Sequence, residues 1–403
     1  MASSPINTVS TKPDTGAPAG ATVLIHLSTV SPEILEPTLS NLAVAFVDQP
    51  ALVAIPESAN LNSTRTFDSL RLLPYAPAAA SKTQWVHTAA DYLNTYKLAQ
   101  ENNATTCILL GAEPQTLQPE SIRHLARTML DSSADLVVSH YHLGAREGLV
   151  NSAILYPLTR ALFCARPRFP LAMDVALSFR MAERLATAAQ RFTATNQEDA
   201  LLWPVSEAAT AGYSIGEVSV PSRAIPQPAT QDLNALLSQI LASLFADIDS
   251  RASFWQRMRT TVPPRTIAAA PTPAEQLDVT PMLDAFHLAY KNLHEIWALV
   301  LPPHTLLGLK RLSVMPQEAF RLADNLWARI VYDFVLAYRL RTINRGHLLG
   351  ALTPLYLAWV ASHLILVQSG VPPEQHIEEV AQAFEADKPY LVSRWRWPDR
   401  FNP

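Results

Sequence analysis

The sequence predicts an α/β domain built on a mostly parallel sheet, followed by an α-helical domain. Two observations carry this prediction. Between residues 21 and 220, short apolar runs typical of strands alternate with segments of helical period, which is the pattern of stacked βα units. From residue 231 onward nearly every segment has helical period, and a proline-rich connector at 221–228 marks the change.

The strands of the first domain are expected at six short apolar runs, 21–27, 52–55, 70–73, 106–110, 136–140 and 214–220. Two helices are expected between them, at 32–46 and 84–101. In the second helix, apolar side chains recur at helical spacing, as at Trp85, Ala89 and Leu93. Crossovers between parallel strands are right-handed, so the carboxyl edge of the sheet is the expected ligand crevice.

The helices of the second half are expected at 231–260, 279–301, 316–343, 348–369 and 373–386. A stretch rich in proline and alanine, 261–280, links the first two. The 403 residues leave room for two domains with sizeable cores. We therefore expect a disordered tail at 1–20, the α/β domain at 21–225 and the helical domain at 226–403.

Composition narrows the class of protein. Hydrophobic residues make up 49% of the chain and charged residues 16%, which indicates broad buried faces. With 31 Lys plus Arg against 35 Asp plus Glu, the net charge of −4 argues against nucleic acid as a partner. Cys107 and Cys164 each lie in an apolar run, which predicts buried thiols in a reducing compartment. The N-terminal stretch lacks the regions of a signal peptide, so we expect a cytoplasmic protein.

One segment, 348–369, has no formal charge and is long enough to cross a bilayer core of ~30 Å at ~1.5 Å per residue. Pro354, Ser362, His363 and Gln368 lie within it and argue against a span. A core helix of the helical domain accounts for the same pattern, and we expect no membrane association. The sequence leaves open whether the chain forms a homo-oligomer.

Chemistry-bearing residues lie beside the expected strands, where a crevice would form. Glu57 begins a polar loop after the second strand, and Glu113 follows the fourth. Asp174 precedes another apolar run, and Glu198 and Asp199 form a carboxylate pair ahead of a further one. Paired carboxylates can hold a proton-abstracting base near a cation or a hydroxyl group.

These residues also have purely structural interpretations. Glu113 suits the start of a helix near 118–123, because acidic side chains favour helix N-termini. The polar stretch 196–199 suits the N-terminal cap of the helix that follows it. Both interpretations remain open from the sequence.

The order of these loops resembles that of family-2 glycosyltransferases of the GT-A fold, especially bacterial enzymes similar to mannosylglycerate and glucosylglycerate synthases. The resemblance covers 21–245, and the helical second half is similar to the appendage of that group. The family loop that holds nucleobase and ribose aligns with 55–65, which implies donor-binding roles for Glu57 and Asn60. Lys82 stands in place of a Gly-Lys-Gly element near the donor phosphates. Glu57 replaces an aspartate, and the loop's two glycine positions are altered.

The Asp-X-Asp element of the family, which binds a divalent metal, aligns with Gly111-Ala112-Glu113. One longer carboxylate remains where two short ones are expected, so the resemblance implies weak binding of Mg²⁺ or Mn²⁺ at Glu113. The family's later metal-binding histidine has no counterpart near Arg223, whose guanidinium could neutralise phosphate without a metal. The donor motifs are thus degenerate.

The acceptor side keeps more of the family pattern. Asp174 retains the carboxylate of the acceptor loop, and Glu198-Asp199 matches the pair with which inverting members deprotonate the acceptor. The expected function is therefore an inverting glycosyltransferase, a hexosyltransferase that moves a sugar from a nucleoside diphosphate donor to a small hydroxyl acceptor. Asp199 would be the base, with Glu198 beside it. The alternative is a catalytically degenerate relative that acts as a binding or scaffold protein.

Overall fold

The structure is a computed structural model that describes residues 22–28, 30–59, 66–76, 86–197, 200–221, 223–224, 233–259, 262–263, 265 and 278–398. Its first half is built on one sheet with the order β3-β4-β2-β1-β5-β7-β6-β8. The strands β3 and β7 run antiparallel to their neighbours, and all other pairs in the sheet are parallel. The strands are β1 (Val23–Leu27), β2 (Ala51–Pro56), β3 (Thr66–Phe67), β4 (Leu70–Tyr75), β5 (Thr106–Leu110), β6 (Leu136–Tyr141), β7 (Val175–Ser178) and β8 (Ile215–Val220).

This mixed sheet, followed by a helical region, is the expected α/β GT-A fold. All six expected strands are present, with ends that differ from the predicted ones by two residues at most. The sequence missed β3 and β7. The strand β7 has only four residues, and a buried apolar run of that length cannot be told from a helical segment by its period.

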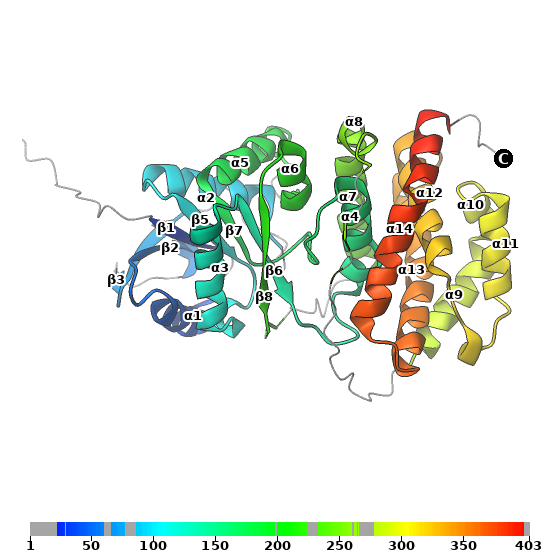
Figure 1. Cartoon of the computed structure of the whole chain (residues 1–403), viewed down its shortest axis with the longest axis horizontal. Coiled ribbons are helices and arrows are strands. Elements are labelled where there is room, and N and C mark those ends of the chain that lie inside the picture. The colour runs from blue at the N-terminus through cyan, green and yellow to red at the C-terminus, as the bar shows by residue number, and fades with distance from the viewer. Residues whose placement is uncertain are drawn as a thin grey trace, which may run out of the picture.

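Helices pack on the sheet in pairs (Figure 1). The helix α1 lies beside α3, and Arg123 of α3 donates to the carbonyl oxygens of Val44 and Ala45 at the end of α1. The helix α2 packs along α5. The sequence missed α5, which has a strong apolar face and a Ser178 cap that accepts from the Met181 amide. The helices of this half are α1 (Pro32–Ala45), α2 (Ala89–Glu101), α3 (Pro119–Ser132), α5 (Phe179–Thr193) and α6 (Pro204–Ala211).

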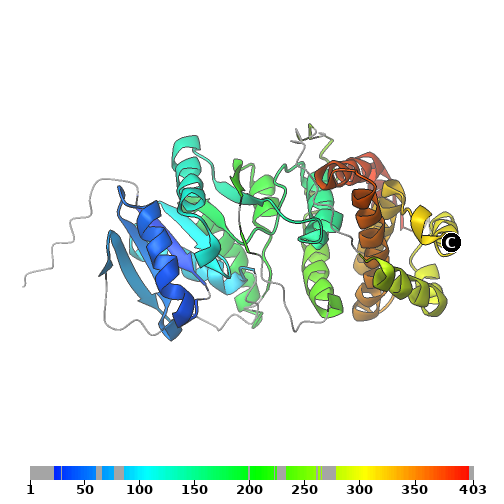
Figure 2. The ribbon, with the colours of Figure 1, turned by 90° about the horizontal axis from the view of Figure 1, so that it is seen from below.

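The connection from β6 to β7 leaves the sheet and enters the helical half. It forms a π-helical turn, η3 (Asn151–Leu155), and the helix α4 (Tyr156–Phe163). Both views place α4 beside α14 (Pro373–Arg396) and away from the sheet (Figure 1 and Figure 2). Trp327 of α12 donates to the Ala153 carbonyl, 2.8 Å away. The predicted domain boundary at 225/226 stays a prediction, and the helical half includes this earlier segment in space.

The second half is helical, as predicted, and buries Trp255, Trp297, Trp327 and Trp359 completely. One observed helix begins later in the chain than the sequence predicts. The expected helix 316–343 begins at Asp324, after a short 3₁₀ turn. The helices are α7 (Leu233–Ser250), α8 (Ala252–Trp255), α9 (Thr280–Asn292), α10 (His294–Ala298), α11 (Pro303–Leu312), α12 (Asp324–Leu340), α13 (Arg345–Gln368) and α14 (Pro373–Arg396), with the 3₁₀ turn η4 (Gln317–Ala319).

The helix α13 contains the apolar segment that is long enough to span a membrane. In this structure, 67% of its 18-residue apolar window is buried. The side chains of Ser362 and His363 are fully buried within it, and Ser362 Oγ accepts from the Leu322 amide. Neighbouring helices therefore cover α13 in the way expected of a core helix.

Candidate functional site

The loop after β5 approaches the chain before β7 very closely. A Cβ atom at Gly111 would lie 2.8 Å from the Cβ of Met173 and 2.9 Å from its carbonyl oxygen, so glycine is required there. The Gly111 amide donates to Asp174 Oδ1 at 3.2 Å. Because β7 is antiparallel, its first residues meet the carboxyl end of β5. Asp174 therefore lies at the edge where the sequence predicts a crevice.

Arg223, just past β8, forms an ion pair with Asp174, and both side chains are fully buried. Its Nε donates to Asp174 Oδ2 at 2.8 Å, and Nη2 donates to Oδ1 at 3.2 Å. The terminal nitrogens also donate to the carbonyl oxygens of Ala112 and Glu113 and to Thr116 Oγ1. Burial opposes the charge of Arg223, but Asp174 outweighs this and raises the pKa of the guanidinium. The structure thus brings three predicted residues together, and every nitrogen of Arg223 is already engaged.

Tyr141, the last residue of β6, completes this cluster and was missed by the sequence analysis. Its hydroxyl donates to Asp174 Oδ2 at 3.0 Å and accepts from the amides of Met173 and Asp174. Burial and the neighbouring carboxylate raise the pKa of Tyr141 well above its usual value. The available signal was its position at the end of an apolar strand, where a ligand crevice is expected.

The Glu113 carboxylate is separate from this ion pair. Glu113 has a left-handed backbone conformation with φ of 55°, and its carboxylate accepts from Gln115 Nε2. It does not start the following α-helix, which begins at Pro119 with Gln118 as its N-cap. The structural interpretation of Glu113 as the start of that helix is therefore wrong.

The donor set for a metal at this edge is small. Asp174 is paired with a cation and accepts from Tyr141 and Gly111, so its oxygens are not free to ligate. Within the described ranges, no group of three or more His, Cys, Asp or Glu side chains is placed to hold a metal ion. Glu113 alone is left, which fits Mg²⁺ or Mn²⁺ only if diphosphate and water supply the other ligands.

The remaining predicted donor residues are not brought to this cluster by the described part of the structure. Glu57 lies on an exposed 3₁₀ turn directly after β2. The strand β1 separates β2 from β5, so Glu57 is two strands away from Glu113 at the same edge. Asn60 and Lys82 lie outside the described residues.

The predicted base pair, Glu198 and Asp199, also lies outside the described residues. The chain just after it is anchored, because the Ala200 carbonyl accepts from the Ala89 amide at 2.9 Å. The next helix, α6, begins at Pro204. The interpretation of 196–199 as its N-terminal cap is therefore wrong, since the cap position is four residues further on.

Further contacts link the segment around Ala200 to the chain just before Asp174. Leu201 forms an antiparallel bridge with Thr88. His87, the residue before Thr88, has its Nε2 atom 2.6 Å from the carbonyl oxygen of Met173. A carbonyl oxygen can only accept a hydrogen bond, so Nε2 of His87 carries the proton. Met173 is the residue before Asp174. The segment that follows Asp199 is thus held beside the Asp174 end of the crevice.

His26, near the carboxyl end of β1, is fully buried, and neither of its ring nitrogens has a hydrogen-bond partner among the residues that the structure describes. Its ring lies 5.0 Å from that of Tyr75. Burial, together with the charge of His87, lowers the pKa of His26 to about 3. The residue is therefore neutral in the folded protein at neutral pH.

We expect this histidine to make folding stability fall on acidification. The unfolded chain binds a proton near pH 6.5 and the folded chain only near pH 3, so stability is lost as the pH falls through this window. The loss for one such group approaches about 1.4 kcal/mol per pH unit. In His26→Phe, the fall of the unfolding free energy with decreasing pH should be smaller but should persist, because burial also lowers the pKa of His363 to about 3. Urea unfolding at pH 7, 6 and 5 measures the slope.

The matched control is His124→Gln, because His124 is exposed on α3. It should leave the slope at the wild-type value. An unchanged slope in His26→Phe would show that His26 does not resist protonation. A packing defect alone would lower stability equally at each pH, so it cannot imitate the predicted result.

The sequence matches no protein-family model and no curated protein. Among solved structures, the chain is similar to glucosyl-3-phosphoglycerate synthase from Mycobacterium tuberculosis in complex with Mn²⁺, UDP and glucosyl-3-phosphoglycerate. The identity is 15%, the match covers 57% of this chain and 80% of that chain, and the TM-score is 0.37. It is also similar to CMP:2-keto-3-deoxy-manno-octonic acid synthetase complexed with CTP, with 12% identity, 56% and 98% coverage and a TM-score of 0.31. At these identities the likeness concerns the fold alone.

Proposed function

We propose that the chain is a glycosyltransferase that moves a sugar from a nucleoside diphosphate donor to a small hydroxyl acceptor, with inversion. The observation that carries this proposal is the meeting of Glu113, Asp174 and Arg223 at the carboxyl edge of a GT-A sheet. This edge is where open α/β sheets bind their ligands. The sequence resemblance assigns donor and acceptor roles to loops that leave the same edge.

The proposed donor contacts come from three loops. Glu57 and Asn60 would lie near the nucleobase and ribose, and Lys82 near the phosphates. Glu113 would contact the diphosphate or a weakly held divalent metal, whose chemistry would be to neutralise the leaving diphosphate. For Arg223 we propose a positioning role in place of direct phosphate contact, because its nitrogens already bind Asp174 and the backbone of the Glu113 loop.

The proposed acceptor side uses carboxylates. Asp174 would lie at the acceptor subsite, where its ion pair with Arg223 holds the carboxylate in place. Asp199 would take the proton of the acceptor hydroxyl, with Glu198 beside it. The anchoring of Ala200 next to α2 supports a position for this pair at the same edge. A base needs to reach the proton it abstracts within hydrogen-bond distance.

A specific observation favours a second candidate function. The closed Arg223–Asp174 pair leaves few free polar groups at the edge, and the donor motifs are degenerate. A catalytically inactive relative that acts as a binding or scaffold protein would also have few free polar groups at this edge and degenerate donor motifs. Donor binding distinguishes the two functions.

We expect Glu113→Ala to abolish whatever metal dependence donor binding has. The wild-type protein should bind a nucleoside diphosphate sugar more tightly with Mn²⁺ or Mg²⁺ than without, because Glu113 is the carboxylate left for the ion. In the variant the two affinities should be equal. Calorimetric titration of a panel of nucleoside diphosphate sugars, with and without metal, measures this.

Glu120→Ala is the matched control, because Glu120 is an exposed carboxylate in the first turn of α3. It should keep the wild-type metal dependence. If the wild-type protein binds no donor across the panel, the transferase proposal fails and the scaffold function is supported.

A further inference from the structure

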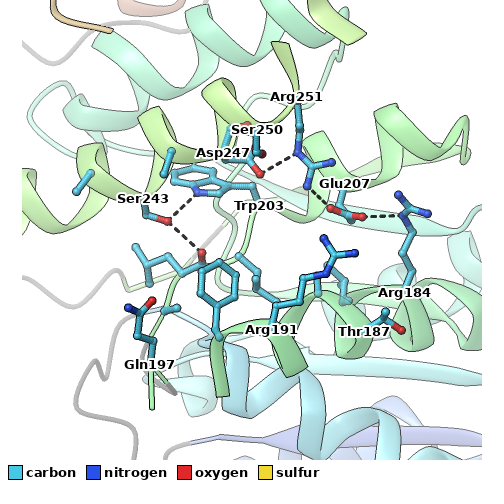
Figure 3. Close-up of a pocket in the computed structure, with 18 of the residues that line it drawn as sticks. Arg184, Thr187, Arg191, Gln197, Trp203, Glu207, Ser243, Asp247, Ser250 and Arg251 are labelled. Carbon is cyan, nitrogen blue, oxygen red and sulfur yellow. Dashed lines mark hydrogen bonds and ion pairs between the residues drawn. The ribbon is translucent and has the colours of Figure 1, made fainter. Parts of the chain in front are cut away.

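A cavity of about 920 Å³ lies between α5 and α6 of the sheet half and α7 of the helical half (Figure 3). Tyr338 of α12 and Arg345 at the start of α13 also line it. Glu113, Asp174 and Arg223 do not line this cavity, whereas Gln197 and Ala200, which flank the proposed base, do. The cavity therefore lies at the junction of the two halves, away from the Arg223–Asp174 pair and next to the segment that carries the proposed base.

Its lining is basic although the chain as a whole is acidic. Five arginines and three carboxylates line it, which leaves an excess of two positive charges, against a net charge of −4 for the protein. The charged lining residues are Arg180, Glu183, Arg184, Arg191, Glu207, Asp247, Arg251 and Arg345. Such a concentration of guanidinium groups around a concave space attracts anions.

Two of the arginines are already neutralised by carboxylates in the wall. Arg184 Nε lies 2.8 Å from Glu207, and Arg251 forms ion pairs with both Glu207 and Asp247 (Figure 3). A third, Arg180, pairs with Asp135 at the amino end of β6. These pairs hold the wall in place and use two of its three carboxylates; the third, Glu183 on α5, accepts a hydrogen bond from the Tyr96 hydroxyl at 3.4 Å. They leave no carboxylate of α6 or α7 for the remaining arginines.

Arg191 and Arg345 are the available cations. Arg191 has no ion pair or hydrogen bond among the described residues, and Figure 3 shows its side chain reaching from α5 across the cavity. Arg345 uses Nε toward the Tyr338 carbonyl at 3.4 Å and stacks on the Tyr338 ring at 4.0 Å. In the described part of the chain, its terminal nitrogens have no acceptor. Each half of the molecule therefore supplies terminal guanidinium nitrogens that have no acceptor among the described residues.

Aromatic side chains supply the rest of the wall. Trp203 is fixed by a hydrogen bond from Nε1 to Ser243 Oγ at 3.0 Å, and Ser243 in turn donates to the Leu201 carbonyl. Tyr213 lies under the guanidinium groups of Arg180 and Arg184. A cavity with rigid aromatic walls and a few charged groups suits an organic ligand better than a bare inorganic ion.

We propose that this cavity binds a small organic anion with at least two negatively charged phosphate or carboxylate groups, held by Arg191 from α5 and Arg345 from α13. Guanidinium groups bind both anions through paired, charge-assisted hydrogen bonds. Because the two arginines belong to different halves, the ligand bridges the junction. The proposal is independent of donor binding, since neither arginine is among the proposed donor contacts and none of Glu57, Glu113 and Arg223 lines the cavity.

Calorimetric titration of the full chain with pyrophosphate, and separately with citrate, tests the site. We expect at least one probe to bind, and Arg191→Gln or Arg345→Gln to weaken it by about 10-fold or more, the usual cost of losing one charged hydrogen bond. The double variant should show no binding. Arg311→Gln on α11, which removes an exposed guanidinium outside the cavity, should bind as the wild type does. Arg191 and Arg345 are exposed, so we expect their variants to fold, and thermal melting checks this.

The two probes distinguish the ligand classes. Binding of pyrophosphate alone assigns the site to phosphorylated compounds, and binding of citrate alone assigns it to polycarboxylates. Absence of binding by both at millimolar concentration would overturn the proposal. So would a double variant that binds as tightly as the wild type, because the anion would then be held elsewhere.

Discussion

Asp199→Asn is expected to lower turnover by about 10²- to 10⁴-fold, which is what a positioned general base usually contributes. Asparagine keeps the size and hydrogen-bonding capacity of the side chain but cannot accept the acceptor's proton. Donor affinity should be nearly unchanged, because the proposed donor contacts lie on the loops after β2, β4 and β5. Steady-state kinetics with the donor identified by calorimetry gives kcat, and the same titration gives the donor Kd.

Gln197→Ala is the control for this experiment. Gln197 precedes the carboxylate pair and carries no ionisable group, so its loss should change kcat little. If Asp199→Asn retains kcat within a few-fold of wild type while the donor still binds, Asp199 is not the base. A loss of donor affinity equal to the loss of turnover would instead assign Asp199 to the donor site.

Arg160→Ala is expected to destabilise the protein by about 3–5 kcal/mol, the typical cost of leaving buried charges unpaired. Arg160 lies on α4 and is 1% exposed. It binds Glu378 and, through Nε and Nη2, both oxygens of Glu385 on α14 at 2.9 and 3.1 Å. Removing the guanidinium leaves two largely buried carboxylates without a cation. Urea unfolding of the variant and the wild type measures the difference.

The control breaks a more exposed pair in the same half. Arg329 and Asp387 join α12 to α14, with side-chain exposures of 35% and 17%. Arg329→Ala should cost about 1 kcal/mol or less, because solvent screens the pair and hydrates the remaining carboxylate. Equal losses in the two variants would show that burial does not make the Arg160 cluster special.

The sequence predicted much of the fold because its signals are local. The strand β5 was placed to the residue, since a continuous apolar run bounded by polar residues is visible in a single window. The position of α4 could not be predicted in this way. Its partners on α14 lie 218 and 225 residues further along the chain, and such a pairing leaves no periodic pattern.

The candidate site was predicted in part for the same reason. Glu113 and Asp174 could be picked out because carboxylates beside apolar strands are conspicuous. Tyr141 could not, since a tyrosine at the end of a strand usually belongs to the core. The pairing of Arg223 with Asp174 depends on β7 running antiparallel between β5 and β6, and that short strand was missed.

The position of α4, between β6 and β7 in the sequence but packed in the helical half, also affects the order in which parts of the protein can fold during synthesis. The α4 segment leaves the ribosome before the helix that covers it, and at about 5–20 residues per second the delay is roughly 10–40 s. During that time the guanidinium of Arg160 has no partner on α14, although it is buried in the finished protein. The segment between β6 and β7 therefore cannot reach its final form as its own residues emerge. Its last step waits for α14, so completion of this segment depends on a helix more than 200 residues further along the chain.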